Sequence, residues 1–286
     1  MNKFYPLKVS SLQSITDEAV VISFNISNEN KELFAYNSGQ YITIKTQING
    51  EEIRRPYSIC SAPEEENLSI GVKKVQNGKM STFLCSELKQ GDVLQVMPPT
   101  GTFILSSNSQ KHIGICAGSG ITPIMSMIKS VIDQQIESSF TLIYGNRTPA
   151  STMFYKDLCD INNDNSNKVK IHWVFSGEKI NGAINGRITK DNLQLLMNMD
   201  PTIKQAEGYF LCGPGDMIDE LNDLLLLNRI PKNNIYFERF TAAEKDKSIN
   251  SQDEEITSNV NIILDGDEFE FELSSDGDTI LDAAMD

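Results

Sequence analysis

Short apolar runs separated by turn residues occupy the first third of the chain. Each run is rich in Val, Ile, Tyr or Thr, which indicates strands joined by turns. The runs lie at residues 19–26, 41–46, 58–60, 68–75 and 93–97. Several short strands at this spacing favour a barrel, so we predict an all-β domain over residues 1–108. One helix is expected near residues 80–88, after the turn at Gly78.

From residue 109 the pattern changes to an alternation of apolar strands and helical stretches. Strands are expected at residues 111–117, 140–144, 168–175, 207–212 and 234–238. Helices are expected between them, at residues 122–136, 152–160, 191–199 and 216–228. Such an alternation is typical of a parallel, doubly wound sheet. We therefore predict a separate α/β domain over residues 109–240.

The remainder of the chain is first polar and then resumes an alternating pattern. Residues 241–257 are charged and nearly without large apolar side chains, which predicts a linker. Two runs at 260–264 and 268–273 then predict a hairpin with Gly266 in its turn. A helix is expected to begin within residues 279–285.

The negative charge is concentrated at the C-terminal end. The formal net charge is −14, and residues 241–286 hold fourteen Asp and Glu against two Lys, which is −12. Residues 1–240 therefore carry only −2 (−14 minus −12). This balance excludes nucleic acid as a partner, because phosphate contacts need a basic face.

Cysteine and histidine usage argues against disulfides and metal centres. The five cysteines are scattered and odd in number, which indicates reduced thiols in a cytoplasmic protein. His112 and His172 lie far apart, and no two cysteines have metal-ligand spacing, so no metal site is expected in this chain. No apolar run has the length of a membrane span, and the N-terminus has no signal-peptide pattern, so no membrane partner is expected.

The stretch Arg55-Pro56-Tyr57-Ser58 has the chemistry to hold a phosphate-bearing ring system. Arg55 and Tyr57 are two positions apart on a predicted strand, so they face the same side. The guanidinium is a fixed planar donor for phosphate, the tyrosine offers a flat surface, and Ser58 adds a hydroxyl. Taken alone, the same residues also suit an ordinary sheet surface.

A second stretch, Gly78-Lys79-Met80-Ser81-Thr82, stands at a predicted helix start. Backbone N–H groups are unpaired there, and the helix dipole favours an anion. The two hydroxyls add donors. Alone, this is equally an ordinary helix cap.

The turn from Gly118 to Gly120 follows a predicted strand and opens a helix, which is the setting of a dinucleotide motif. The glycines let the backbone approach a pyrophosphate closely, and Pro123 suits the first helical turn. Thr122 is then expected beside the nicotinamide. The stretch Cys212-Gly213-Pro214 ends another strand on the same edge of the sheet.

Together and in this order, the four stretches resemble those of the ferredoxin–NADP(+) reductase family, from about residue 5 to Phe240. The resemblance implies a six-stranded Greek-key barrel that binds FAD and an α/β domain that binds NAD(P)H. It also implies the activity, which is transfer of a hydride from a nicotinamide to the flavin.

The resemblance assigns roles residue by residue. FAD is expected on Arg55, Pro56, Tyr57, Ser58, Gly78, Met80, Ser81, Thr82 and Phe240. NAD(P)H is expected on Gly118, Gly120, Thr122, Pro123, Asn146, Arg147, Ser151, Cys212, Gly213 and Pro214. The catalytic residues are expected to be Ser58, Cys212 and Glu238. In these roles the cysteine orients the nicotinamide without acting as a nucleophile, and the glutamate manages a proton.

Arg147 ends the second strand of the predicted sheet, where the adenosine ribose should lie. An arginine there, together with Ser151, suits the 2′-phosphate of NADPH, whereas an acidic residue would favour NADH. No Asp or Glu follows before Asp157. We therefore predict NADPH, with NADH as the alternative.

Residues 260–284 resemble the opening hairpin and helix of a plant-type ferredoxin. Four cysteines hold the cluster of that family, three of them at C-x4-C-x2-C spacing, and no cysteine follows Cys212 here. Residues 258–286 are therefore expected to be an incomplete β-grasp ferredoxin domain. A [2Fe–2S] cluster is expected only in a longer parent protein.

This order of domains resembles the reductase components of multicomponent oxygenases, such as those that act on phenylacetyl-CoA. It implies that electrons pass through the protein's own ferredoxin domain to an oxygenase component, in aromatic degradation. A separate ferredoxin, a hybrid-cluster protein or free flavin are alternative acceptors. A non-catalytic flavin-binding subunit is a further alternative, against which the presence of Ser58, Thr122 and Cys212 argues.

Overall fold

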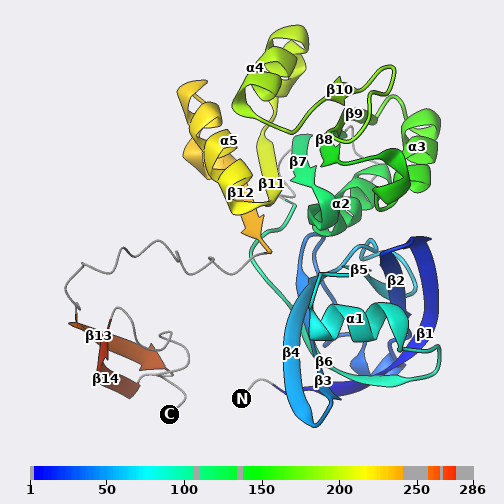
Figure 1. Ribbon diagram of the computed structural model, residues 1–286, viewed down its shortest axis with the longest axis vertical. Coiled ribbons are helices and arrows are strands. Elements are labelled where there is room, and N and C mark those ends of the chain that lie inside the picture. Colours follow the sequence, from blue (N-terminus) through cyan, green and yellow to red (C-terminus); the bar gives the residue numbers. More distant parts are fainter. Residues whose placement is uncertain (1–2, 106–109, 134–137, 241–256, 265–266, 275–286) are drawn as a thin grey trace. The chain divides into compact units, whose positions relative to one another are not determined.

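The computed structural model describes residues 3–105, 110–133, 138–240, 257–264 and 267–274 (Figure 1). The chain divides into two compact units, Met1–Thr241 and Ala242–Asp286.

The first unit begins with an antiparallel sheet of six strands. These are β1 (Tyr5–Thr16), β2 (Ala19–Phe24), β3 (Tyr41–Ile48), β4 (Glu51–Ser58), β5 (Leu68–Lys73) and β6 (Val93–Thr100). Their order is β4-β3-β6-β1-β2-β5, and a bridge between Ile59 and Ile70 joins the two ends of the sheet. Alternate residues such as Ile22, Phe24 and Ile42 are fully buried inside. The predicted barrel is therefore confirmed, with two differences. The apolar runs did not reveal β1, and β4 lies at Glu51–Ser58 where a strand was predicted at residues 58–60.

Helix α1 (Lys79–Ser86) packs against β3, β4 and β5. It buries Met80, Ser81 and Leu84 in or beside the barrel core. The predicted helix is confirmed, with its start and its end one and two residues earlier than expected. Its first turn thus stands beside the strand that carries Arg55.

The rest of the first unit is a parallel sheet covered by helices. Its strands are β7 (Lys111–Ala117), β8 (Ser139–Asn146), β9 (Val169–Phe175), β10 (Ile184–Asn185), β11 (Gly208–Gly213) and β12 (Ile235–Arg239). They lie in the order β10-β9-β8-β7-β11-β12, and every neighbouring pair is parallel. The predicted doubly wound sheet is confirmed, with the short β10 added at one edge.

Four helices cover the two faces of this sheet (Figure 1). They are α2 (Ile121–Asp133), α3 (Tyr155–Asp164), α4 (Lys190–Met199) and α5 (Gly215–Leu227). One apolar cluster joins α2 and α3 to one face and also takes in barrel residues such as Phe103. Another joins α4 and α5 to the opposite face. Helix α2 therefore lies between the sheet and the barrel.

Helix α3 starts later than the sequence pattern predicts. Thr148 caps a 3-10 turn at Pro149–Ser151, and Phe154 adopts a left-handed backbone conformation immediately before the helix. Further 3-10 turns lie at Asn28–Asn30, Gly118–Gly120, Pro201–Gln205 and Lys232–Asn234.

The second unit contains a hairpin of β13 (Thr257–Leu264) and β14 (Asp267–Ser274). The strands are antiparallel, with Val260 opposite Phe271 and Leu264 opposite Asp267. The predicted hairpin is confirmed. The predicted helix at residues 279–285 and nearly all of the predicted linker lie outside the described residues.

Polar contacts tie α2 to the barrel. The Ser126 hydroxyl donates to the Ser61 carbonyl oxygen at 2.6 Å, and Lys129 pairs with Glu65 at 2.8 Å. The hydroxyls of Ser38 and Ser130 lie 2.5 Å apart and are buried. Buried polar groups that satisfy each other in this way favour one relative placement of the barrel and the sheet.

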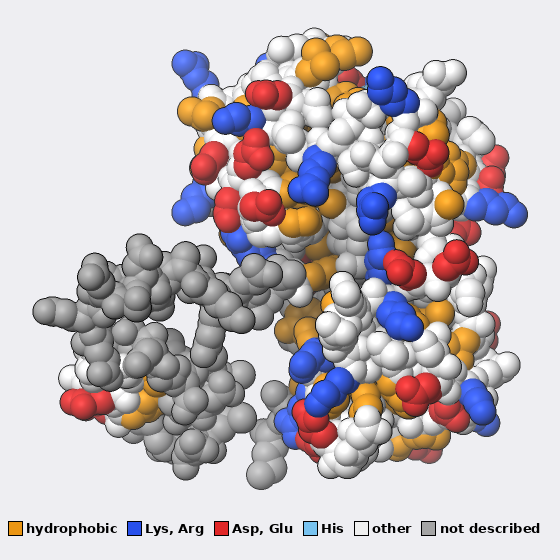
Figure 2. Space-filling view, in the orientation of Figure 1, with side chains coloured by type: hydrophobic (Ala, Val, Ile, Leu, Met, Phe, Trp, Pro, Cys, Tyr) orange, Lys and Arg blue, Asp and Glu red, His pale blue; other side chains and the backbone are white. Residues whose placement is uncertain are grey.

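Figure 2 shows that Lys and Arg are interspersed with Asp and Glu over this face of the first unit. The mixture agrees with the near-neutral balance of residues 1–240. None of the helices that the structure describes has both the length and the apolar character needed to cross a bilayer.

Gly39 lies just before β3, where the segment that follows β6 meets α2, and a substitution there should affect stability. Its φ is +101°, and a Cβ there would collide with the Phe103 carbonyl oxygen and lie 2.5 Å from Met127 Cε. Gly39→Ala should therefore cost about 1–3 kcal/mol of unfolding free energy beyond the backbone strain alone. Gly50→Ala is the matched control, because its φ is +82° and no heavy atom lies within 4 Å of the added Cβ. Urea unfolding measures both, and equal losses in the two variants would contradict the prediction.

Candidate active site

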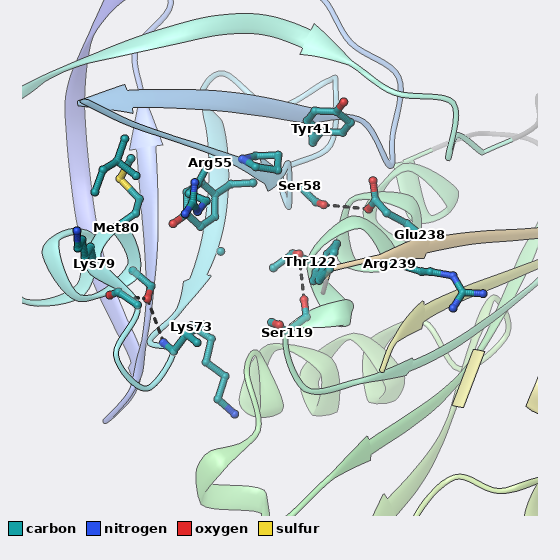
Figure 3. Close-up of a pocket in the computed structure, with 18 of the residues that line it drawn as sticks. Tyr41, Arg55, Ser58, Lys73, Lys79, Met80, Ser119, Thr122, Glu238 and Arg239 are labelled. Carbon is teal, nitrogen blue, oxygen red and sulfur yellow. Dashed lines mark hydrogen bonds between the residues drawn. The ribbon is translucent and has the colours of Figure 1, made fainter. Parts of the chain in front are cut away.

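A cavity of about 690 Å³ opens between the barrel and the parallel sheet, within the size range of small-ligand sites (Figure 3). Strands β4 and β5, the start of α1, the start of α2 and the end of β12 all contribute to its wall. Ten of the predicted site residues line it: Arg55, Pro56, Tyr57, Ser58, Gly78, Met80, Ser81, Thr122, Glu238 and Phe240. The fold thus brings parts of the first three stretches to one place, together with the end of β12, whereas the cysteine turn does not line this cavity.

Strand β4 presents Arg55 and Tyr57 to the cavity, as their spacing of two predicts. Arg55 is exposed, and its guanidinium donates to the Arg54 carbonyl oxygen at 2.7 Å. Tyr57 is half-buried, and burial raises the pKa of its hydroxyl well above the usual range. A neutral aromatic face beside an arginine suits a flat ring system that carries a phosphate.

Four cations line the cavity, and two of them are neutralised by neighbours. Lys79 pairs with Glu51, and Arg239 pairs with Asp219 on α5. Among the described residues no carboxylate lies at ion-pair distance from Arg55 or Lys73. The charge available to an anionic ligand is therefore on β4 and β5.

The first turn of α1 faces the same space. Gly78 is the N-cap, and no side chain satisfies the helix N–H groups. The Ser81 hydroxyl accepts from the Val75 amide at 3.1 Å and donates to the Gly78 carbonyl oxygen at 3.3 Å, so it shapes the preceding loop. Thr82 does not line the cavity, and its amide donates to the Gly78 carbonyl oxygen at 3.0 Å. The donors left for a pyrophosphate are thus mainly backbone N–H groups.

Ser58 and Glu238 meet across the cavity although 180 residues separate them in sequence. The serine hydroxyl donates to Glu238 Oε2 at 3.1 Å, and the two side chains point toward one another (Figure 3). Burial raises the pKa of Glu238 from 4.5 to about 7, and the Ser58 hydrogen bond lowers it in part. A carboxyl with this pKa exchanges a proton at neutral pH.

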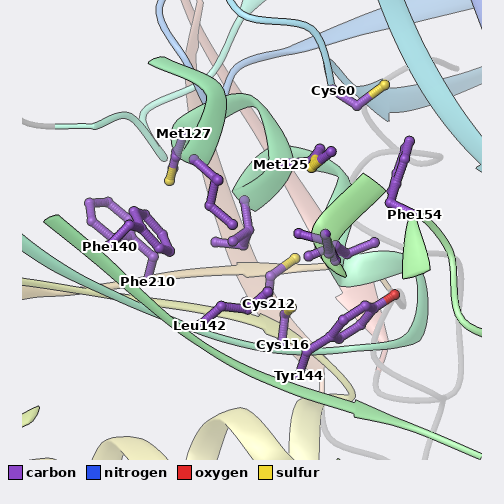
Figure 4. Close-up of a cluster of buried hydrophobic side chains, with 14 of the residues drawn as sticks. Cys60, Cys116, Met125, Met127, Phe140, Leu142, Tyr144, Phe154, Phe210 and Cys212 are labelled. Atoms are coloured by element: carbon purple, nitrogen blue, oxygen red, sulfur yellow. The ribbon is translucent and has the colours of Figure 1, made fainter. Parts of the chain in front are cut away.

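Cys212 lies beside this pair in the sheet. It stands opposite Glu238 on β12 and opposite Cys116 on β7, and its side chain is fully buried in the apolar cluster (Figure 4). Burial raises its pKa well above the usual range, so the thiol stays protonated. A packing role fits this environment, and a nucleophilic role does not.

The glycine turn and the cysteine turn lie at the switch point of the sheet. Strands β7 and β11 are neighbours, and from β7 the chain proceeds toward β8, whereas β11 leads toward β12. Ligands of doubly wound folds bind at the carboxyl ends of such strands. A Cβ on Gly120 would collide with the Cys212 carbonyl oxygen, and one on Gly213 would lie 3.3 Å from the Ala117 amide nitrogen.

The other predicted residues at these two turns differ in their exposure and surroundings. Gly118 has a φ of +55° with open space beside it, where a ligand could approach the backbone. Pro123 is buried within the first turn of α2, and Pro214 is exposed as the N-cap of α5. Of the predicted nucleotide residues, only Thr122 lines the large cavity.

The predicted adenosine residues lie at the end of β8. Asn146 is half-buried, and its side-chain Nδ2 has no partner among the described residues. Arg147 is exposed. The Ser151 hydroxyl is hydrogen bonded to Thr148 in the cap of the 3-10 turn that follows Arg147, so it stabilises this loop.

Several lining residues were missed by the sequence analysis, and Gly71 is the clearest. A glycine inside a strand marks a close backbone approach, and this signal was present in the run at 68–75. A Cβ on Gly71 would lie 2.6 Å from Thr122 Cγ2, at the contact between β5 and α2. Lys73 is two positions further on the same strand and so shares its face. Tyr41, Asn77, Ser119 and Arg239 also line the cavity.

FAD fits the residues present. The volume, the unneutralised Arg55 and the uncapped start of α1 match a ligand with a flat ring system and a pyrophosphate. In the described part of the chain no cluster of three or more His, Cys, Asp or Glu could hold a metal ion.

Comparison with known proteins gives two family matches. Residues 6–104 match the oxidoreductase FAD-binding domain, and residues 115–223 match the oxidoreductase NAD-binding domain. Both cofactors that the sequence analysis expected are therefore supported by whole-domain matches.

The chain is also similar to named proteins. It is 33% identical over 293 residues to one component polypeptide of the 1,2-phenylacetyl-CoA epoxidase of Escherichia coli (strain K12), covering all of this chain and 81% of that protein. Phthalate dioxygenase reductase is 25% identical, with a TM-score of 0.67 over 94% of this chain and 76% of that one. A ferredoxin NADP+ reductase from Neisseria gonorrhoeae with bound FAD and NADP shares the fold, with a TM-score of 0.72 at 18% identity over 84% of this chain and all of that one.

The raised pKa of Glu238 makes a prediction about stability and pH. The folded pKa of about 7 exceeds the ordinary 4.5, so the folded chain binds this proton more tightly than the unfolded chain does. The resulting stability is fully present below pH 4.5 and is lost as the pH rises through 7. Between about pH 5.5 and about pH 8 the wild type should therefore lose more stability than Glu238→Gln.

Thermal unfolding at the two pH values measures this difference. Glu87→Gln, a change at an exposed carboxylate after α1, is the control and should behave as the wild type. Parallel curves for the wild type and Glu238→Gln would show that Glu238 ionises normally.

Proposed function

We propose that this chain takes a hydride from NADPH and delivers electrons to an iron–sulfur acceptor. It belongs to the ferredoxin reductase family of FAD- and NAD-binding oxidoreductases. The observation that carries the proposal is the cavity in which the flavin motif of β4 meets Thr122 and the Ser58–Glu238 pair.

FAD would be held by side chains of β4 and by the backbone at the start of α1. Arg55 would bind a phosphate, Tyr57 would lie against the ring system or its sugar chain, and the N–H groups after Gly78 would receive the pyrophosphate. Phe240, which is 41% exposed, would cover the ring at the cavity mouth. The bound flavin supplies the chemistry of accepting a hydride and releasing electrons one at a time.

The protein's own contribution is orientation and proton handling. Thr122, on α2, lines the cavity where the nicotinamide is expected, and Cys212 is packed in the interior at the end of β11. The Glu238 carboxyl would hold or release a proton near neutral pH, and its Oε2 accepts a hydrogen bond from the Ser58 hydroxyl. Both side chains line the cavity, so this proton is within reach of a ligand bound there.

The acceptor is inferred from the relatives. The protein that is 33% identical is part of a phenylacetyl-CoA epoxidase, and phthalate dioxygenase reductase transfers electrons from pyridine nucleotides to [2Fe-2S]. These names support an oxygenase component as the final recipient, with aromatic degradation as the setting and a ferredoxin-type domain as the first acceptor. A cytoplasmic location agrees with the five free cysteines.

Anaerobic stopped-flow spectroscopy tests the function directly. The purified, FAD-loaded chain should lose its flavin absorbance when mixed with NADPH, because we expect the nicotinamide to meet the flavin beside Thr122. A yellow protein that neither NADPH nor NADH bleaches would overturn the reductase function and favour a binding protein without catalysis.

Arg147 provides a prediction about the choice of nucleotide. Loss of one charge-assisted hydrogen bond, worth about 1.5–3 kcal/mol, should reduce the preference for NADPH over NADH at least roughly tenfold in Arg147→Ala. The ratio of the two second-order bleaching rates measures it. Lys156→Ala removes an exposed cation from the nearby helix α3 and should leave the ratio unchanged. An unchanged ratio in Arg147→Ala would place the 2′-phosphate elsewhere.

A further inference from the structure

Phe154 has an unusual backbone conformation for its residue type. Its φ is 58° and its ψ is 23°, the left-handed region, directly before the first residue of α3. A bulky aromatic residue is rare there, and such strain costs roughly 1–3 kcal/mol. The side chain is only 6% exposed, so packing of the ring in the interior holds the residue in place.

The ring packs against the seam between the barrel and the sheet. A Cβ placed on Gly71 would lie 3.3 Å from Phe154 Cζ, 3.1 Å from Met153 Cε and 2.6 Å from Thr122 Cγ2. Three side chains from two segments, Thr122 from α2 and the adjacent Met153 and Phe154 from before α3, therefore converge on one glycine of β5. Gly71 and Thr122 both line the cavity, whereas Phe154 lies behind them.

The same segment is continuous with the loop at the end of β8. The Thr152 hydroxyl donates to the Thr148 carbonyl oxygen at 2.7 Å, and the Ser151 amide donates to the Thr148 hydroxyl at 3.3 Å. The Leu158 amide donates to the Phe154 carbonyl oxygen at 2.8 Å, which fixes the start of α3. Hydrogen bonds thus fix the chain on both sides of Phe154, in the Thr148 loop before it and at the start of α3 after it.

The buried Tyr144 hydroxyl adds a link to the glycine turn. It lies 2.8 Å from the Gly118 carbonyl oxygen and 3.4 Å from the Met153 carbonyl oxygen. The segment that carries Phe154 is therefore linked through Tyr144 to the turn that precedes Thr122, and both Phe154 and Thr122 border Gly71.

We propose that Phe154 is a positioning residue for hydride transfer, which fixes Thr122 against Gly71 and so sets the nicotinamide end of the site from behind. This inference rests on the proposed function, because it takes Thr122 as the neighbour of the nicotinamide. Phe154 does not touch the cavity, so it acts only through Thr122 and Gly71.

The decisive experiment separates hydride transfer from nucleotide binding in Phe154→Leu. The matched control is Phe140→Leu, because Phe140 belongs to the same buried cluster but lies at its other end (Figure 4). Both changes remove a buried ring and should lower the thermal midpoint to a similar degree.

Two measurements are made on each FAD-loaded variant. The first is the limiting rate of anaerobic flavin bleaching at saturating NADPH. The second is the dissociation constant of 2′,5′-ADP, which carries only the adenosine end. Trp173 reports this binding by its fluorescence, since it is the chain's single tryptophan and lies on the strand next to β8.

Phe154→Leu should slow the limiting rate at least roughly tenfold, because misplacement of reacting groups by about 1 Å can cost more than this. Its 2′,5′-ADP dissociation constant should stay within about twofold of the wild type, because the loop cap at Thr148 is intact. Gly71→Ala, whose added Cβ would lie 2.6 Å from Thr122 Cγ2, should slow the rate with the same pattern.

Three results would overturn the proposal. One is a limiting rate in Phe154→Leu equal to the wild type. Another is an equal slowing in Phe140→Leu, which would indicate general loosening of the core. The third is a loss of 2′,5′-ADP affinity that accounts for the whole effect. A wild-type protein that is not bleached at all would instead overturn the proposed function, and that result is distinct from these.

Discussion

Helix α2 packs on two sides at once, and the arrangement of the site depends on that double contact. One side lies on the parallel sheet, and the other meets the barrel through Ser126, Lys129 and Ser130. Ten of its thirteen residues are buried, as expected for a helix with little solvent-facing surface. Its first turn carries Thr122, so the barrel and the sheet together fix where this residue stands.

The same enclosure explains the electrostatics of the cavity. Glu238 comes from the last strand of the parallel sheet and Ser58 from the end of β4, so the hydrogen bond between them joins the two halves of the unit. Burial then raises the pKa of the carboxyl toward neutrality, although the serine hydrogen bond opposes the shift. At the cavity edge the charges are paired near solvent instead, Lys79 with Glu51 and Arg239 with Asp219.

Local patterns predicted much of this fold and only part of its site. The apolar runs located β7 and most other strands, and the glycine turn after β7 was recognised from its setting. Long-range placement was harder to predict, because the hydrogen-bond partner of Glu238 lies 180 positions away in the sequence. Ser81 was expected to face a phosphate, yet its hydroxyl accepts a hydrogen bond from the Val75 amide in the preceding loop. Such a local bond to the backbone competes with ligand binding, and composition does not reveal it. The sequence did not single out Phe154, because nothing in it distinguishes a phenylalanine with a left-handed backbone conformation from an ordinary helix residue.

The burial of Cys212 has a consequence for how the protein withstands its own chemistry. Reduced flavins meet oxygen, and the peroxide that results attacks thiolates far faster than protonated thiols. A thiol that stays protonated in apolar surroundings is a soft, polarizable packing group with little reactivity. The site can thus retain a cysteine beside redox chemistry without making it the first group to be oxidised.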